Sequence, residues 1–231
     1  MSAYSGPEIV EDGLVLLLDA GNTKSYPGTG TVWFDLSGNG NNFNVLASAW
    51  NQSGYFNFGG SFGYAKNSAD IPLSGEVTYC VLTLPLNSTS QWRTLTRSYS
   101  ADHHVIIQSG GWLIGMYDNN GGAFINSGYS QQSLPGYATQ NFDFMTWRWS
   151  NSDNPTYDLN VNGIQRATIV NSNARYNRGF GSIGCYHNGS TNPATGSQPW
   201  GNIAYFAAYN RRLSDPEVQQ NFNAIKGRYG V

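Results

Sequence analysis

Charged residues are scarce in this chain, and cysteines are almost absent. The 231 residues include 12 Lys plus Arg, 14 Asp plus Glu and only 2 Cys. A net charge of -2 built from so few charges leaves no basic surface for a phosphate backbone, so nucleic acid is not expected as a partner. Cys80 and Cys185 stand far apart without CxxC spacing, which predicts two buried thiols rather than a redox or metal site.

Long apolar runs are also missing. No segment approaches the roughly 20 apolar residues that span a bilayer, so membrane insertion is not expected. Residues 1–10 lack the basic start and the apolar core of a signal peptide. These features predict a product that is made and kept in a cytoplasm, unless it leaves by lysis or through a dedicated machine.

Turn-forming and aromatic residues, in contrast, are abundant. The chain has 28 glycines, and aromatic residues make up 14% of it. Glycine, Asn and Ser provide the turns that many short antiparallel strands need, while the aromatic rings provide apolar surface for a core. The length suits a single β-sandwich domain. We therefore divide the chain into an N-terminal arm, residues 1–12, and one domain, residues 13–231.

Short β-like segments recur along the domain. Residues 13–20 (GLVLLLDA) form an apolar run that predicts a central strand covered on both faces, and residues 76–84 also carry bulky groups on both faces. The pair Asn162-Gly163 between strand-like flanks is typical of a type I′ hairpin turn. Further strands are expected at residues 55–58, 61–66, 92–96, 104–108, 112–117, 142–149, 179–185 and 201–209.

One helix is expected near the C-terminus, at residues 214–227. Ser214 suits the N-cap, Pro216 the first turn, and Glu217 the capping-box position three residues after the N-cap, while Gly227 predicts the end of the helix. The whole pattern predicts an all-β fold: a two-sheet antiparallel jelly-roll sandwich of roughly a dozen strands, with this short helix at its edge.

Three stretches resemble a known superfamily: residues 13–42, the YDLNVNG hairpin at 157–163, and GNIAYFAAYNRRLSDPEVQQNF at 201–222. They are similar to the concanavalin A-like lectin/glucanase superfamily, in particular to the laminin-G-like domains of structural proteins of tailed bacteriophages, including cyanophages. The resemblance covers roughly residues 12–229. It implies a virion component, such as a capsid decoration or a neck, tail or fibre part, which assembles in the host cytoplasm with other virion proteins as partners. One fold hosts many functions, so the function must be argued separately.

Catalysis finds little support in the carboxylates. Glycoside hydrolysis needs two of them about 5–10 Å apart. The glucanase members of the superfamily place them as Glu-x-Asp-x-x-Glu on one strand, and this spacing is missing from the chain. Asp215 and Glu217 suit a helix N-terminus instead. We therefore expect a non-enzymatic protein and keep a glycoside hydrolase as the third alternative.

Calcium binding is one interpretation of a glycine-rich loop. Asp35, Ser37 and Asn39 stand at alternate positions before a glycine, as in the first half of an EF-hand loop, but Leu46 occupies the position of the bidentate Glu. A simple glycine-rich turn is the other interpretation. A calcium site at the rim of the sandwich that involves Asp35, Asn39 or Asp118 stays open, and no other cofactor is expected.

Glycan binding needs an aromatic platform for the apolar face of a sugar and polar groups for its hydroxyls. Two segments combine both: a strand end with its turn, and the border of a long polar loop. A sandwich this aromatic buries most of its rings, so a place in the core is the competing interpretation for each. The candidate carbohydrate-binding residues are Trp112, Tyr117, Asp118, Asn119, Asn120, Tyr186, His187, Asn188 and Trp200.

Together these features favour a structural function: a virion surface module that decorates or joins a phage particle, with adhesion to a host-surface glycan as an added role. Loops rich in Gly, Asn, Ser and Tyr suit protein contacts, and an arm at residues 1–12 that crosses to a neighbour would fit the same interpretation. The alternative is a dedicated carbohydrate-binding, lectin-like module.

Overall fold

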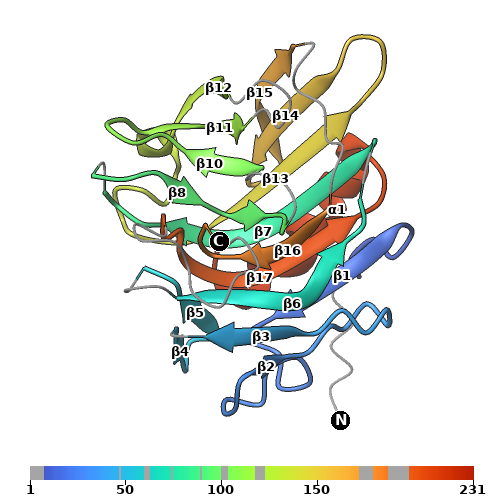
Figure 1. The fold of residues 1–231 in the computed structure, drawn as a ribbon, viewed down its shortest axis with the longest axis vertical. Coiled ribbons are helices and arrows are strands. Elements are labelled where there is room, and N and C mark those ends of the chain that lie inside the picture. The colour runs from blue at the N-terminus through green and yellow to red at the C-terminus, as the bar shows by residue number, and fades with distance from the viewer. Residues whose placement is uncertain are drawn as a thin grey trace.

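The expected short strands form antiparallel sheets. The computed structural model describes residues 8–46, 48–59, 63–73, 75–88, 90–99, 104–117, 123–171, 179–186 and 198–231. Within these ranges the chain forms 17 strands, one 3-10 turn and one α-helix, and the strands pair in three sheets (Figure 1). No helix in these ranges combines the length and the apolar character that crossing a bilayer requires.

The largest sheet has eight strands. Its order is β15 (Ile164–Val170), β14 (Thr156–Val161), β13 (Asp143–Ser150), β7 (Val77–Pro85), β17 (Gly201–Tyr209), β5 (Tyr55–Asn57) and β4 (Ala49–Asn51). The eighth strand, β1 (Leu14–Asp19), pairs with the second half of β17, on the same side as β5. As expected, the β14–β15 hairpin turns at Asn162 and Gly163, whose φ angles of 52° and 78° are those a type I′ turn requires.

Two smaller sheets together form the facing layer. One has the order β2 (Val32–Trp33), β3 (Phe43–Leu46), β6 (Tyr64–Ile71), β16 (Phe180–Ile183) and β9 (Thr96–Arg97). The other has the order β12 (Phe124–Ser130), β11 (Leu113–Tyr117), β10 (Val105–Ile107) and β8 (Arg93–Thr94). Leu95 joins them, because its N–H donates to Val105 and its carbonyl accepts from Gly184. The facing layer is therefore continuous.

The inner core lies between the two layers. Buried side chains of all three sheets share one apolar cluster. At its centre the Tyr79 ring meets Trp149, Phe180 and Phe206 at centroid distances of 5.3, 5.2 and 5.4 Å. Since Phe180 belongs to the facing layer and the other rings to the eight-stranded sheet, these contacts hold the layers together.

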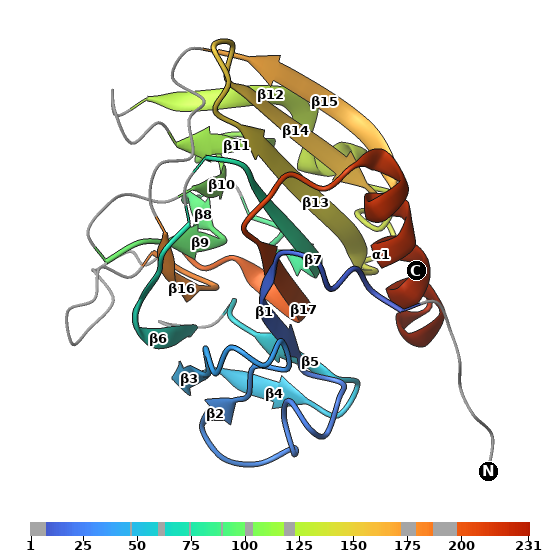
Figure 2. The same ribbon diagram turned by 90° about the vertical axis from the view of Figure 1, so that its right-hand side faces the viewer.

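The helix α1 (Asp215–Tyr229) packs on the outer face of the eight-stranded sheet, opposite the two smaller sheets (Figure 2). The expected position at the sandwich edge is therefore wrong, because Val218 and Ile225 fill a second apolar cluster on that face. The capping box at Ser214 forms as predicted. The helix ends at Gly230, with φ 70°, rather than at Gly227. Its last turn persists because Tyr229 donates a hydrogen bond to Asp19 at 2.7 Å.

Residues 8–12, the described part of the predicted arm, lie along α1. The Val10 N–H donates to Asn221 Oδ1 at 2.8 Å, and the Val10 carbonyl accepts from the Tyr209 hydroxyl at 3.0 Å. Val10 is 7% exposed within the second apolar cluster. This part of the arm therefore packs on its own domain.

Candidate functional site

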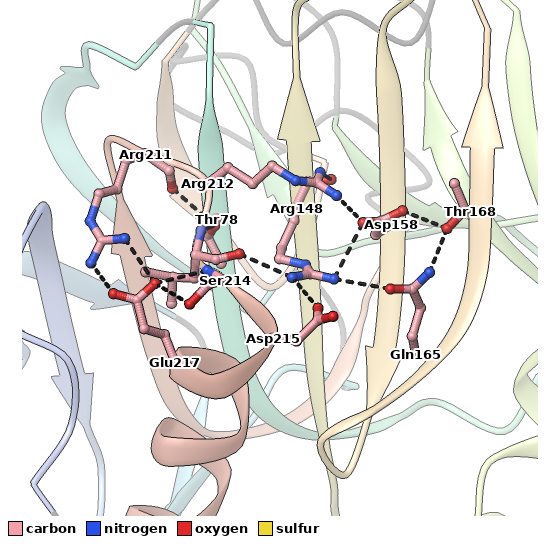
Figure 3. Close-up of polar contacts among 11 residues, drawn as sticks. Thr78, Arg148, Asp158, Gln165, Thr168, Arg211, Arg212, Ser214, Asp215 and Glu217 are labelled. Atoms are coloured by element: carbon pink, nitrogen blue, oxygen red, sulfur yellow. Dashed lines mark hydrogen bonds and ion pairs between the residues drawn. The ribbon is translucent and has the colours of Figure 1, made fainter.

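A polar hollow of about 660 Å³ opens on the outer face of the eight-stranded sheet, beside the N-terminus of α1 (Figure 3). We call it the polar hollow. Its floor comes from β13, β14 and β15, and its wall from residues 211–217, which include the start of the helix. The Asn162-Gly163 turn pairs Asn160 with Gln165, and a register shift between Leu159 and Asn160 then places Asp158 opposite Thr168.

A buried ion pair occupies the floor of the polar hollow. Arg148 and Asp158, whose side chains are each 3% exposed, lie 3.3 Å apart. Arg212 also pairs with Asp158, and the Thr168 hydroxyl donates to it at 2.7 Å. Arg148 in turn donates to the carbonyl of Leu213 and reaches Asp215 at 2.7 Å. These contacts tie the sheet to the segment that leads into the helix, and they satisfy charges that would otherwise be costly to bury.

A second ion pair closes the polar hollow at the start of the helix. Arg211 binds Glu217 with two hydrogen bonds of 2.6 and 3.0 Å, and Glu217 also accepts from the Ser214 N–H at 2.8 Å. The hydrogen bonds from Arg211, followed by those from Ser214, lower the pKa of Glu217 from 4.5 to about 2. Glu217 is therefore held ionised, which does not suit an acid that must donate a proton near neutral pH.

The pH dependence of stability offers a test of this pair. Because the folded pKa of Glu217 lies below its unfolded value, its contribution is present above pH 4.5 and is lost as the pH falls toward 2. Glu217→Gln keeps the capping-box contact and should cost about 1 kcal/mol at pH 7. The difference from the parent protein should shrink in urea titrations as the pH approaches 3. Glu76→Gln, a change at an exposed acid of the same hollow, should have a much smaller effect; an equal, pH-independent loss in both variants would contradict this assignment.

A smaller pocket lies at the end of the eight-stranded sheet, where β5 and β7 end and β17 begins. It measures about 210 Å³, and we call it the rim pocket. Four side-chain amides and a short apolar stretch line it. They are Asn57, Asn87, Gln140 and Asn202, together with Gly59, Leu84, Pro85, Leu86 and Gly201.

Two part-buried aromatic rings border the rim pocket. The Tyr137 hydroxyl donates to Asn87 Oδ1 at 3.2 Å, and the Tyr137 ring meets the Trp112 ring edge to face at a centroid distance of 5.7 Å. Both rings keep part of their surface exposed. Tyr137 is therefore linked to the pocket through Asn87, and Trp112 is linked to it through Tyr137.

Arg93 supports this surface from behind. Its side chain is fully buried, and its guanidinium donates to the carbonyls of Leu86 at 3.2 Å, Gln108 at 3.1 Å and Gly111 at 2.9 Å, and also to that of Ser88. The guanidinium also lies 5.3 Å from the centre of the Trp112 ring. Burial lowers the pKa of Arg93 to about 10, so the side chain stays charged at neutral pH. One cation thus fixes the loop at 86–88 relative to the turn at 108–111.

The structure separates the residues expected to bind carbohydrate. Trp112 lies beside the rim pocket, whereas Tyr117 is part-buried at the far end of β11 and Tyr186 is part-buried under Arg97, whose guanidinium lies 4.0 Å from its ring. Trp200 is fully buried, so an exposed platform at this position is wrong. Its indole donates to Thr83 Oγ1 at 2.7 Å in the core, behind the rim pocket. Asp118, Asn119, Asn120, His187 and Asn188 lie outside the described residues.

The loop that starts at Asp35 covers an edge of β1. Asp35 accepts hydrogen bonds from the N–H groups of Leu17, Ser37 and Asn41, each at 2.9 Å, and Asn39 donates to the Leu14 carbonyl. In the described part of the chain β1 pairs with β17 alone, so the expected central strand is an edge strand protected by a loop.

This geometry bears on the calcium interpretation. The carboxylate of Asp35 already accepts several hydrogen bonds, and a cation would have to displace those donors. Asp118 lies outside the described residues. The described residues contain no group of three or more His, Cys, Asp or Glu placed to hold a metal. A rim calcium site stays a prediction.

Sequence reasoning missed most of the rim pocket. Its amides are spread from position 57 to position 202. Asn57 meets Asn202 through the pairing of β5 with β17, and Asn87 and Gln140 are both hydrogen-bonded to Tyr137. One local signal was present. Arg93 follows Trp92 inside a predicted strand, and an arginine in that position indicates either a buried, paired cation or a sheet edge.

Comparison with known proteins identifies the fold class. No family model matches the chain, and no curated protein sequence matches it. Trypanosoma rangeli sialidase is similar in structure, with a TM-score of 0.62 and 15% identity over 94% of this chain and 33% of that chain. The ligand binding domain of botulinum neurotoxin serotype D, solved with N-acetylneuraminic acid, has a TM-score of 0.60 and 15% identity, over 94% of this chain and 52% of that chain. The binding domain of Paraclostridial Mosquitocidal Protein 1 has a TM-score of 0.61 and 16% identity, over 92% of this chain and 52% of that chain.

This chain therefore has an antiparallel jelly-roll β-sandwich fold, and the predicted fold class is confirmed. It spans about a third to a half of the length of the proteins just named. Identities of 14–16% show the fold alone. None of the three names refers to a phage, so a place in a virion stays a prediction.

Proposed function

We propose that this protein is a carbohydrate-binding module that holds a glycan at the rim pocket without hydrolysing it. The observation that carries the proposal is the amide-lined pocket with the part-exposed rings of Tyr137 and Trp112 beside it. Aromatic faces pack against the C–H groups of a sugar ring, while amides donate to and accept from its hydroxyls. This combination is what a neutral, hydroxyl-rich ligand requires.

The size and rigidity of the rim pocket support the same conclusion. Its volume of about 210 Å³ lies below the roughly 300–1,000 Å³ typical of pockets for drug-sized ligands, so it fits one sugar unit. Arg93 fixes the loop that carries Asn87 and the turn that leads to Trp112. A surface held in place before the ligand arrives loses less entropy on binding.

The similar structures support a binding role. One of them is a neurotoxin domain solved with N-acetylneuraminic acid, and another is the binding domain of a mosquitocidal protein. The carboxylates of this chain support the absence of hydrolysis. The residues that line the rim pocket include no acid, and in the polar hollow Asp158, Asp215 and Glu217 are paired with arginines.

Trp112→Ala tests the site directly. Loss of the aromatic platform should weaken binding to the best glycan of an array about tenfold or more, which corresponds to about 1.4 kcal/mol or more. Isothermal titration calorimetry on the full chain would measure this change, and thermal unfolding would check the fold. Phe34→Ala removes a ring that is 41% exposed on a different loop and should leave binding unchanged. Equal affinity of the Trp112→Ala variant and the parent protein would exclude the rim pocket as the glycan site.

A place on a phage particle is the finer part of the proposal, and it rests on the sequence resemblance. A virion surface module with this site would attach the particle to a host-surface glycan. Mass spectrometry of purified particles should then find the chain at a constant copy number. Its absence from the particles would remove the virion role and leave the glycan site to be judged separately.

A further inference from the structure

Hydrogen bonds around the rim pocket determine which atoms two of its asparagines present. Asn57 Oδ1 accepts from the Gly59 N–H at 2.7 Å, and Asn87 Oδ1 accepts from the Tyr137 hydroxyl at 3.2 Å. Within the described part of the chain, no hydrogen bond involves the Nδ2 group of either residue, and both residues are exposed. Each of these oxygens therefore already has one hydrogen-bond donor, whereas the two N–H groups of each asparagine are available to a ligand.

Gln140 can supply an acceptor. One N–H of its Nε2 donates to the carbonyl of Tyr137 at 2.5 Å, and within the described part of the chain its Oε1 accepts no hydrogen bond, so the oxygen is available to a ligand. The residue lies at the tip of a loop and has a φ angle of 54°. Gly136 holds this loop, because its N–H donates to the buried carboxylate of Asp143 at 2.9 Å. The rim pocket thus has donors from two asparagines and an acceptor from a glutamine in fixed positions.

An apolar surface lies between these polar groups. Leu84 and Leu86 are part-buried and line the pocket. A side chain at Gly59 would approach Leu86 Cδ1 to 3.4 Å and Asn57 Oδ1 to 3.0 Å, so glycine at this position keeps the leucine methyl group and the amide accessible. The pocket can therefore contact a methyl group and an amide at the same time.

We propose that the rim pocket selects an uncharged N-acetylhexosamine, an inference that rests on the proposed glycan-binding function. An acetamido group has one carbonyl acceptor, one N–H donor and one methyl group. The asparagine donors match the carbonyl, Gln140 Oε1 matches the N–H, and the two leucines match the methyl group. A plain hexose lacks the group that makes all three contacts, so it binds more weakly.

The same pocket disfavours acidic sugars. The residues that line it include no Lys, Arg or His. The guanidinium of Arg93, behind the pocket, is committed to four carbonyl oxygens. A sugar carboxylate would lose water there without gaining a cationic partner, which is unfavourable. N-acetylneuraminic acid has the acetamido group but also the carboxylate, so it separates the two effects.

Calorimetric titration of the full chain tests this specificity. The ligands are oligosaccharides that end in N-acetylglucosamine, N-acetylgalactosamine, glucose, galactose or N-acetylneuraminic acid. The N-acetylhexosamine ligands should bind about tenfold or more tightly than the hexoses and than N-acetylneuraminic acid.

Asn57→Asp provides the matched variant. The new carboxylate still accepts from the Gly59 N–H, so the local turn is kept, but the Nδ2 donors are lost. The preference for N-acetylhexosamine should fall about tenfold or more. Asn126→Asp makes the same chemical change at an exposed asparagine that accepts from the Gly128 N–H at 2.7 Å, and it should leave the preference unchanged.

The outcomes distinguish the inference from the function on which it rests. Binding that depends on Trp112 but does not distinguish hexose from N-acetylhexosamine, or that favours the acidic sugar, overturns the inference and leaves the glycan-binding function intact. A preference that survives Asn57→Asp also overturns it. If no ligand of the panel and no glycan of the array binds, both the function and the inference fail.

Discussion

Asp158→Ala should lower the free energy of unfolding by about 3–5 kcal/mol. The carboxylate of Asp158 is 3% exposed and lies 3.3 Å from Arg148, which is equally buried. Removing it leaves the Arg148 guanidinium buried with one carboxylate fewer, and it also removes a partner of Arg212. A buried charge that loses its counterion costs far more than a surface pair because water cannot replace the missing partner. Urea unfolding at pH 7 would measure the loss.

Asp215→Ala is the matched control for this prediction. Asp215 also binds Arg148, at 2.7 Å, but its side chain is 75% exposed. Water can replace it, so the expected loss is about 1 kcal/mol or less. Equal losses in the two variants would show that burial does not determine the strength of this network.

Arg93→Met should cost about 3 kcal/mol of stability and weaken glycan binding more than tenfold. Methionine keeps much of the side-chain length but donates no hydrogen bond, so four carbonyls of the rim lose their common donor. These carbonyls can reach water only if the loop at 86–88 and the turn at 108–111 move. That movement would displace Asn87 and Trp112, the residues to which we assign ligand contacts.

The comparison variant for this effect is Arg166→Met. Arg166 is exposed on β15, and its replacement should change stability by less than about 0.5 kcal/mol and leave binding unchanged. Chemical unfolding and calorimetric titration would be applied to both variants. If Arg93→Met loses stability but binds glycan as tightly as the parent protein, Arg93 contributes only to folding and does not position the rim pocket.

The two tryptophans proposed as sugar platforms show how far sequence reasoning extended. Both Trp112 and Trp200 stand beside turn-forming residues, and nothing local distinguishes them. Trp200 precedes β17, which has neighbouring strands on both sides, and its ring packs edge to face with Trp147 at 6.3 Å inside the sandwich. Trp112 begins a strand at the rim and stays partly exposed. The layer that covers a ring decides its exposure, and that layer comes from distant parts of the chain.

Local sequence alone determined the features that depend on neighbouring residues. The Asn162-Gly163 turn and the capping box at Ser214 and Glu217 formed as predicted, because each is specified by backbone preferences and hydrogen bonds within a few residues. The alternation of apolar and turn-forming segments also predicted the all-β class. Only the tertiary structure determined that the rim pocket forms, that Trp200 is buried and that β1 lies at a sheet edge. Each of these depends on which strands pair across more than a hundred residues, and local periodicity carries no information about that choice.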